Sequence, residues 1–105
     1  MANDYLYAPM IRIAIVDDHA MVRAGLRQFF ADQPDFQVVA EAVNGRDALD
    51  IVRQGEVDVM VMDISMPDHS GVDALVAIKA RAPDLPVLIL SGFAEVHYAT
   101  TLLRQ

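Results

Sequence analysis

The stretch IVDDHAMVR, residues 15–23, decides how the chain is organised, because an apolar run stops there and a helical pattern begins. Residues 11–16 (IRIAIV) are short and rich in β-branched side chains, which is typical of a buried strand. Apolar side chains then recur at helical spacing: Met21, Val22, Leu26, Phe29 and Phe30. Asp17 and Asp18 therefore lie where a strand ends and a helix begins. Adjacent carboxylates at such a junction repel each other unless a cation lies between them.

The same strand-then-helix pattern occurs four times along the chain. Further strands are predicted over residues 36–42 (FQVVAEA), 57–63 (VDVMVMD) and 85–90 (LPVLIL). The later helices are predicted from an N-cap at Asn44 to Gly55, from Ser70 or Gly71 to Pro83, and from Ala94 to Gln105. Apolar strands without polar alternation, each followed by a helix, predict an α/β fold with a parallel sheet covered on both faces.

Length and composition bound the class of protein. With 105 residues, 54% of them hydrophobic, the chain has enough sequence for one compact domain. No apolar run approaches the roughly 18 residues of a membrane span, and the first ten residues lack the basic start of a secretory signal. The chain has no cysteine, which agrees with a cytoplasmic location. Its net charge of −7 argues against direct binding to nucleic acid.

Polar side chains follow three of the predicted strands, where a parallel sheet places its sites. They are Asp17, Asp18, Asp63 and Ser91. If the first and third strands are neighbours, about 4.8 Å apart, the carboxylates repel by roughly 3 kcal/mol per pair at an effective dielectric of about 20. A hard divalent cation such as Mg²⁺ would relieve this. Asp63 could then act as a nucleophile, its acyl phosphate neutralised by the metal and the Ser91 hydroxyl.

Structural explanations compete with this chemistry. Asp18 could simply cap the first helix, and Asp63 could simply end a strand. Carboxylates at both strand ends make two independent structural explanations less attractive, whereas a serine such as Ser91 after a strand is usually a turn residue. The scattered arginines are interpreted as solvated helix positions. The histidines form no ligand pattern: His19, His69 and His97.

Four separated motifs together resemble the receiver domain of two-component response regulators: IVDDH, EAVNGRDAL, VMDISMPDHSG and PVLILSG. The resemblance runs from about Ile11 to the last residue, so residues 1–10 are expected to be an N-terminal extension and residues 11–105 the domain. The sequences VDDHAMVRAGL and FQVVAEAVNG are most similar to those of receivers that precede a LuxR-type helix-turn-helix output domain. The family implies a flavodoxin-like (CheY-like) doubly wound sheet with strand order 2-1-3-4-5.

The resemblance also implies roles for individual residues. Asp63 would accept phosphate from a histidine kinase. Ser91 matches the switch hydroxyl that moves toward the phosphoryl group, and Gly92 the small residue beside it. The magnesium ligands that the family implies are Asp17, Asp18, Asp63 and the backbone carbonyl of Ser65. The residues that match the loop shaping the site are Met66, Pro67 and Gly71.

The sequence departs from the family at its end. Receivers continue with a fifth strand, which carries a lysine and a switch aromatic, and a fifth helix, whereas this sequence stops inside the predicted fourth helix. Lys79 precedes the fourth strand and cannot be that lysine. We therefore expect the order 2-1-3-4, with residues 85–90 at an edge through which the chain could self-associate. Contact with DNA is expected only through a domain not present here, and none with a membrane.

The main hypothesis is a phosphoacceptor module that catalyses no reaction except its own phosphorylation at Asp63. Three alternatives stay open beside it. A haloacid-dehalogenase-like phosphatase also uses an Asp nucleophile with magnesium, but it needs a second Asp two residues on, where this sequence has Ser65. A nucleotide or flavin binder needs glycines after the first strand, where this sequence has DDHAM. A receiver-like interaction module that is never phosphorylated is opposed by the acids and favoured by the missing lysine.

Overall fold

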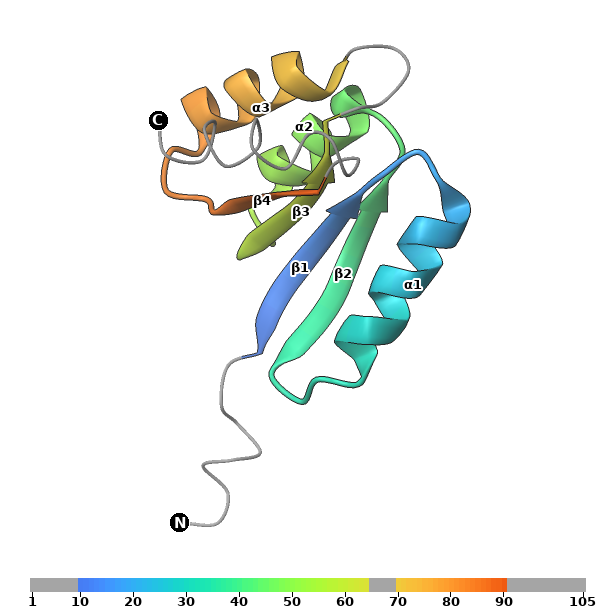
Figure 1. Ribbon diagram of the computed structural model, residues 1–105. Helices are drawn as coiled ribbons and strands as arrows, with labels where there is room; N and C mark the ends of the chain where they lie inside the picture. Colours follow the sequence, from blue (N-terminus) through green and yellow to red (C-terminus); the bar gives the residue numbers. More distant parts are fainter. Residues whose placement is uncertain (1–9, 65–69, 91–105) are drawn as a thin grey trace, which may run out of the picture.

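The computed structural model describes residues 10–64 and 70–90, in which strands and helices alternate as predicted (Figure 1). The elements are β1 (Ile11–Val16), α1 (Ala20–Ala31), β2 (Phe36–Ala42), α2 (Gly45–Gln54), β3 (Val59–Asp63), α3 (Ser70–Arg81) and β4 (Val87–Leu90). The helix predicted from Ala94 lies outside the described residues. None of the described helices has the length and apolar composition of a membrane span.

The four strands of the described residues run parallel in the order β2-β1-β3-β4, which confirms the predicted fold class. α1 lies against one face of the sheet, along β1 and β2, and α2 and α3 lie against the other face (Figure 1). The carboxyl ends of β1 and β3 are neighbours, because Val16 pairs with Met62. This topology brings the residues that follow the two central strands to one edge of the sheet.

The larger part of the core lies between the sheet and the helices α2 and α3. Met60, Met62 and Ile78 are fully buried there. On the other face Ile13 and Ile15 are buried, with Leu26 and Phe30 of α1 packed partly over them. α1 itself contains no fully buried residue, so it is the more exposed of the two helical layers.

β2 departs from the expectation of strands without alternation, because exposed and half-buried residues alternate along most of it. β2 is an edge strand, and it contains a bulge: Ile13 pairs with Val38 and Ala14 with Ala40, which leaves Val39 as an extra residue. The bulge reverses the side-chain alternation. Val38 packs on the α1 face, whereas Ala40 packs on the α2 face.

The predicted boundaries of α2 are confirmed, whereas two strand starts are wrong. Asn44 caps α2 by accepting a hydrogen bond of 2.8 Å from the Asp47 amide, and Gly55 ends it with a φ of 71°. β4 begins at Val87 instead of residue 85, because the Leu85 amide donates to the Ala82 carbonyl and the next residue is a proline. β3 likewise begins two residues later than predicted, at Val59.

At the amino end of the sheet, Arg12 and Asp58 join β1 to the residue before β3. The Arg12 amide donates to Asp58 Oδ2 at 2.8 Å, the Arg12 Nε donates to the same oxygen at 3.1 Å, and the Asp58 amide donates to the Arg12 carbonyl at 2.8 Å. The side-chain hydrogen bond from Arg12, together with its amide and its charge, lowers the pKa of Asp58. Opposite charges thus pair directly at this end of the two strands.

Candidate functional site: an acidic cluster at the carboxyl edge

The structure brings together the acids that follow β1 and β3. Asp17 is 4% exposed and Asp63 is 6% exposed, so both carboxylates are buried. Each of Asp17, Asp18, His19 and Asp63 offers one possible ligand atom, and these atoms all lie within 4.8 Å of one another. Parallel strands with carboxyl ends at the same edge produce this cluster, as the sequence predicted.

Asp17 is fixed by the backbone around it. Its amide donates to the Ala42 carbonyl at the end of β2, at 3.0 Å. Its Oδ1 accepts a hydrogen bond of 2.7 Å from the His19 amide. These two contacts hold the turn between β1 and α1 and set the direction of the Asp17 carboxylate.

Asp18 is not the cap of α1, so the interpretation of it as a helix cap is wrong. The N-cap position belongs to His19, and its side chain makes no capping hydrogen bond. Asp18 Oδ1 is buried and accepts no hydrogen bond, although the His19 Nδ1 atom lies 3.0 Å from it. A buried carboxylate oxygen in this state raises the free energy of the fold, and a hard cation would satisfy it. The donor set of three clustered carboxylates fits Mg²⁺, which prefers oxygen ligands.

His19 is the residue of this cluster that sequence reasoning missed. Its Nδ1 lies 2.8 Å from Asp17 Oδ1, 3.0 Å from Asp18 Oδ1 and 3.9 Å from Asp63 Oδ2, while 61% of the side chain is exposed. The hydrogen bond to Asp17 and the charges of Asp18 and Asp17 raise the pKa of His19. Its position directly after two acids at a strand end was the available signal.

Gly71 holds the start of α3 against the strand end that carries Asp63. A Cβ atom at Gly71 would lie 2.6 Å from both the Cα and the carbonyl oxygen of Ile64, the residue after Asp63. Only glycine permits this approach of two backbone segments. Five further predicted site residues lie outside the described part of the chain: Ser65, Met66, Pro67, Ser91 and Gly92.

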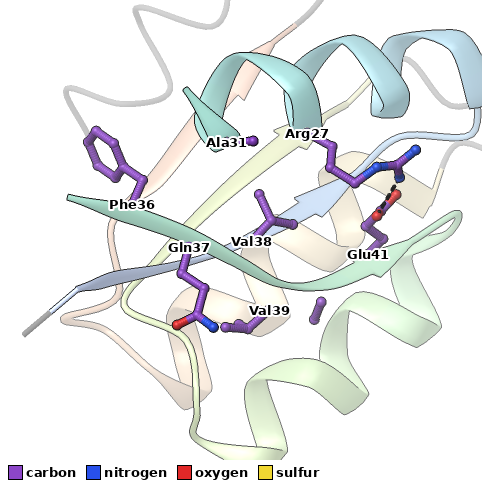
Figure 2. Close-up of a pocket in the computed structure, with 8 residues that line it drawn as sticks. Arg27, Ala31, Phe36, Gln37, Val38, Val39 and Glu41 are labelled. Carbon is purple, nitrogen blue, oxygen red and sulfur yellow. Dashed lines mark hydrogen bonds and ion pairs between the residues drawn. The ribbon is translucent and has the colours of Figure 1, made fainter. Parts of the chain in front are cut away.

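A cavity of about 490 Å³ lies elsewhere, along β2 and beside α1 (Figure 2). Its lining runs from Phe36 to Glu41, with Arg27 and Ala31 from α1, and includes none of the clustered acids. The acidic cluster is therefore a feature of the sheet edge and is separate from this cavity.

A family model, curated relatives and solved structures all indicate one protein family for this chain. Residues 13–105 match the response regulator receiver domain. The transcriptional regulatory protein DegU of Brevibacillus brevis is 37% identical over 102 residues, which cover 97% of this chain and 43% of DegU. The chain thus spans less than half the length of this curated relative.

Solved structures agree in fold, and one of them is a LuxR-family regulator. A LuxR-family two-component response regulator from Aurantimonas sp. SI85-9A1 has a TM-score of 0.76 and 33% identity, covering 88% of this chain and 68% of that one. The complex of the CheA3 P1 domain with CheY6 from R. sphaeroides contains a chain with a TM-score of 0.73 and 36% identity, covering 92% of this chain and 74% of that one. These likenesses, together with the buried acids at the carboxyl edge, show that the chain belongs to the response regulator receiver domain family of two-component systems.

Proposed function

We propose that the chain is a phosphoacceptor module in which Asp63 receives the phosphoryl group. Asp17, Asp18, Asp63 and the backbone carbonyl of Ser65 would hold Mg²⁺. The observation that carries the proposal is the cluster of carboxylates at the edge of the sheet, in which Asp18 Oδ1 is buried without a hydrogen-bond partner.

The phosphorylation step needs little from the protein besides position and charge. A carboxylate oxygen of Asp63 attacks the phosphorus of the donor, the bond from phosphorus to the donor breaks, and its electron pair leaves with the donor. The product is an acyl phosphate on Asp63 with roughly two negative charges. Magnesium, when bound, neutralises the carboxylates and the phosphoryl oxygens. The His19 amide keeps the Asp17 carboxylate turned toward the edge.

A histidine kinase is the proposed donor, supported by the likeness to a structure in which CheY6 is bound to the P1 domain of CheA3. The proposed output is control of transcription through a domain outside this sequence, supported by DegU and by the LuxR-family neighbour. Ser91 and Gly92 remain the proposed switch residues. Family membership removes the support for a phosphatase, and phosphorylation of Asp63 is the one covalent step that we assign to this chain.

Intact-mass analysis after incubation with acetyl phosphate and Mg²⁺ tests the phosphoacceptor. We expect one added phosphoryl group on the wild type and none on Asp63→Asn, and a chelator should abolish the label. Asp50→Asn, which removes an exposed aspartate of α2, is the matched control and should be labelled like the wild type. Equal labelling of wild type and Asp63→Asn would refute the assignment, and no labelling of any protein would favour an unphosphorylated interaction module.

The edge of β4 supports a second proposal, self-association of the chain as given. Among the described residues β4 pairs with β3 alone, and Leu88 is 48% exposed. An apolar edge strand presents backbone groups to a second copy. Light scattering across a concentration series should show a mass that rises with concentration and rises less in Leu88→Lys. A monodisperse monomer at high concentration would contradict this proposal.

A further inference from the structure

Arg23 contacts the acidic cluster from the side of α1 without belonging to it. Its Nη1 donates a hydrogen bond of 2.8 Å to the backbone carbonyl of Asp17. Only 20% of the Arg23 side chain is exposed, so it is packed into the fold, unlike the solvated arginine that the sequence suggested. Asp17 is thus held by its amide through Ala42 and by its carbonyl through Arg23.

Glu41 orients Arg23 from β2. Arg23 Nε lies 3.4 Å from Glu41 Oε1, and Arg27 Nη1 donates a hydrogen bond of 2.6 Å to Glu41 Oε2. Figure 2 shows the second pair, with Arg27 reaching from α1 toward Glu41. The bulge at Val39 places Glu41 on this face, because regular alternation after Val38 would point it toward α2.

We propose that Arg23, oriented by Glu41, is a positioning residue for the magnesium site. By fixing the Asp17 carbonyl it holds the turn that presents Asp17 and Asp18 to the cation. The inference rests on the proposed function, since it concerns the cation of that site. Groups that hold metal ligands in place through hydrogen bonds commonly change metal affinity by about 10- to 100-fold when removed.

The sign of the effect separates positioning from simple electrostatics. Arg23 carries a positive charge beside a cation site, so Coulomb's law alone predicts that removing it strengthens Mg²⁺ binding. Positioning predicts the opposite, because the two acids lose the turn that aligns them. Arg23→Met keeps most of the aliphatic stem and removes the donor, so we expect its Mg²⁺ dissociation constant to rise about tenfold.

The experiment is calorimetric titration of Mg²⁺ into the wild type, Arg23→Met, Arg23→Lys and Arg27→Met. Arg23→Lys keeps a cationic donor and should recover most of the affinity. Arg27→Met removes an equal charge from the same helix without touching Asp17, and its dissociation constant should stay within about twofold of the wild type, since an exposed charge is screened. Unchanged or tighter binding by Arg23→Met, equal weakening in Arg27→Met, or no recovery in Arg23→Lys would each overturn the inference.

Glu41→Gln supplies a second route if Arg23→Met does not fold. It leaves the Arg23 donor in place and removes the carboxylate that orients it, so binding should weaken in the same direction by a smaller factor. The double variant should bind no more weakly than Arg23→Met alone, and additive losses would show that Glu41 does not act through Arg23. A wild type that fails to bind Mg²⁺ would instead refute the proposed function itself.

Discussion

The two ends of the β1–β3 pair carry charge in opposite ways. At the amino end Arg12 and Asp58 pair through side chain and backbone, and both side chains are 42% exposed. At the carboxyl end, a few residues along the same strands, Asp17, Asp18 and Asp63 gather like charges, and the buried Asp18 Oδ1 makes no hydrogen bond. The first arrangement completes itself within the fold. The second is only partly compensated, by His19, and a bound cation would lower its free energy further, which is the property of a site rather than of a scaffold.

Disturbing the backbone contact between Gly71 and Ile64 at the carboxyl end should cause the largest loss of stability. Gly71→Ala forces a methyl group into the Ile64 backbone and should lower the free energy of unfolding by about 1–3 kcal/mol. Gly25→Ala in α1 meets no atom within 4 Å and should raise it by about 0.5–1 kcal/mol, because alanine is the better helix former. Urea denaturation measures both. Equal stability of Gly71→Ala and the wild type would contradict the close approach of α3.

Removing one like charge from the acidic cluster should stabilise the metal-free fold. Asp18→Asn should raise the free energy of unfolding by up to about 3 kcal/mol, because it removes repulsion from Asp17 and Asp63. Thermal melts in the presence of a chelator measure this. A lower melting temperature for Asp18→Asn would mean that the Asp18 carboxylate supports the fold directly.

Removing the ion pair at the amino end should cause the smallest change in stability, and it should destabilise the fold where Asp18→Asn stabilises it. Asp58→Asn should lower the melting temperature at neutral pH, because it removes the partner of Arg12. Since Arg12 lowers the pKa of Asp58, the stability from this pair is present above the ordinary pKa of 3.8 and is lost as the pH falls through the lower folded value. Arg12→Met should flatten the same acidic part of the stability profile. A profile unchanged by either variant would show that the exposed pair contributes nothing.

The part of the site that depends on strand order was predictable from the sequence. Alternating strands and helices place the ends of the strands at one edge, and the strand order implied by the family resemblance makes β1 and β3 neighbours, so the approach of Asp17 and Asp63 was predictable. The difference between Asp17 and Asp18 was not predictable. It depends on which carboxylate accepts the His19 amide, and adjacent identical residues give no signal of that.

The residues that hold the site in place, Arg23 and Glu41, could not be predicted from the sequence pattern either. FQVVAEA contains nothing that marks a bulge at Val39, yet the bulge decides that Glu41 faces α1. Without that register Arg23 looks like any other arginine on an amphipathic helix. The alternation of exposed and half-buried residues along β2 was not predicted either, because an edge strand and a central strand can have equally apolar sequences.

The response of stability to Mg²⁺ tests the central claim, that the carboxyl edge is completed by a cation and the amino edge is not. Melts of the wild type, Asp18→Asn and Asp58→Asn should be recorded with chelator and with Mg²⁺ at ten times its dissociation constant. The wild type and Asp58→Asn should each gain about 1.4 kcal/mol, and Asp18→Asn should gain almost nothing. An equal gain in Asp18→Asn, or no gain in the wild type, would contradict the account.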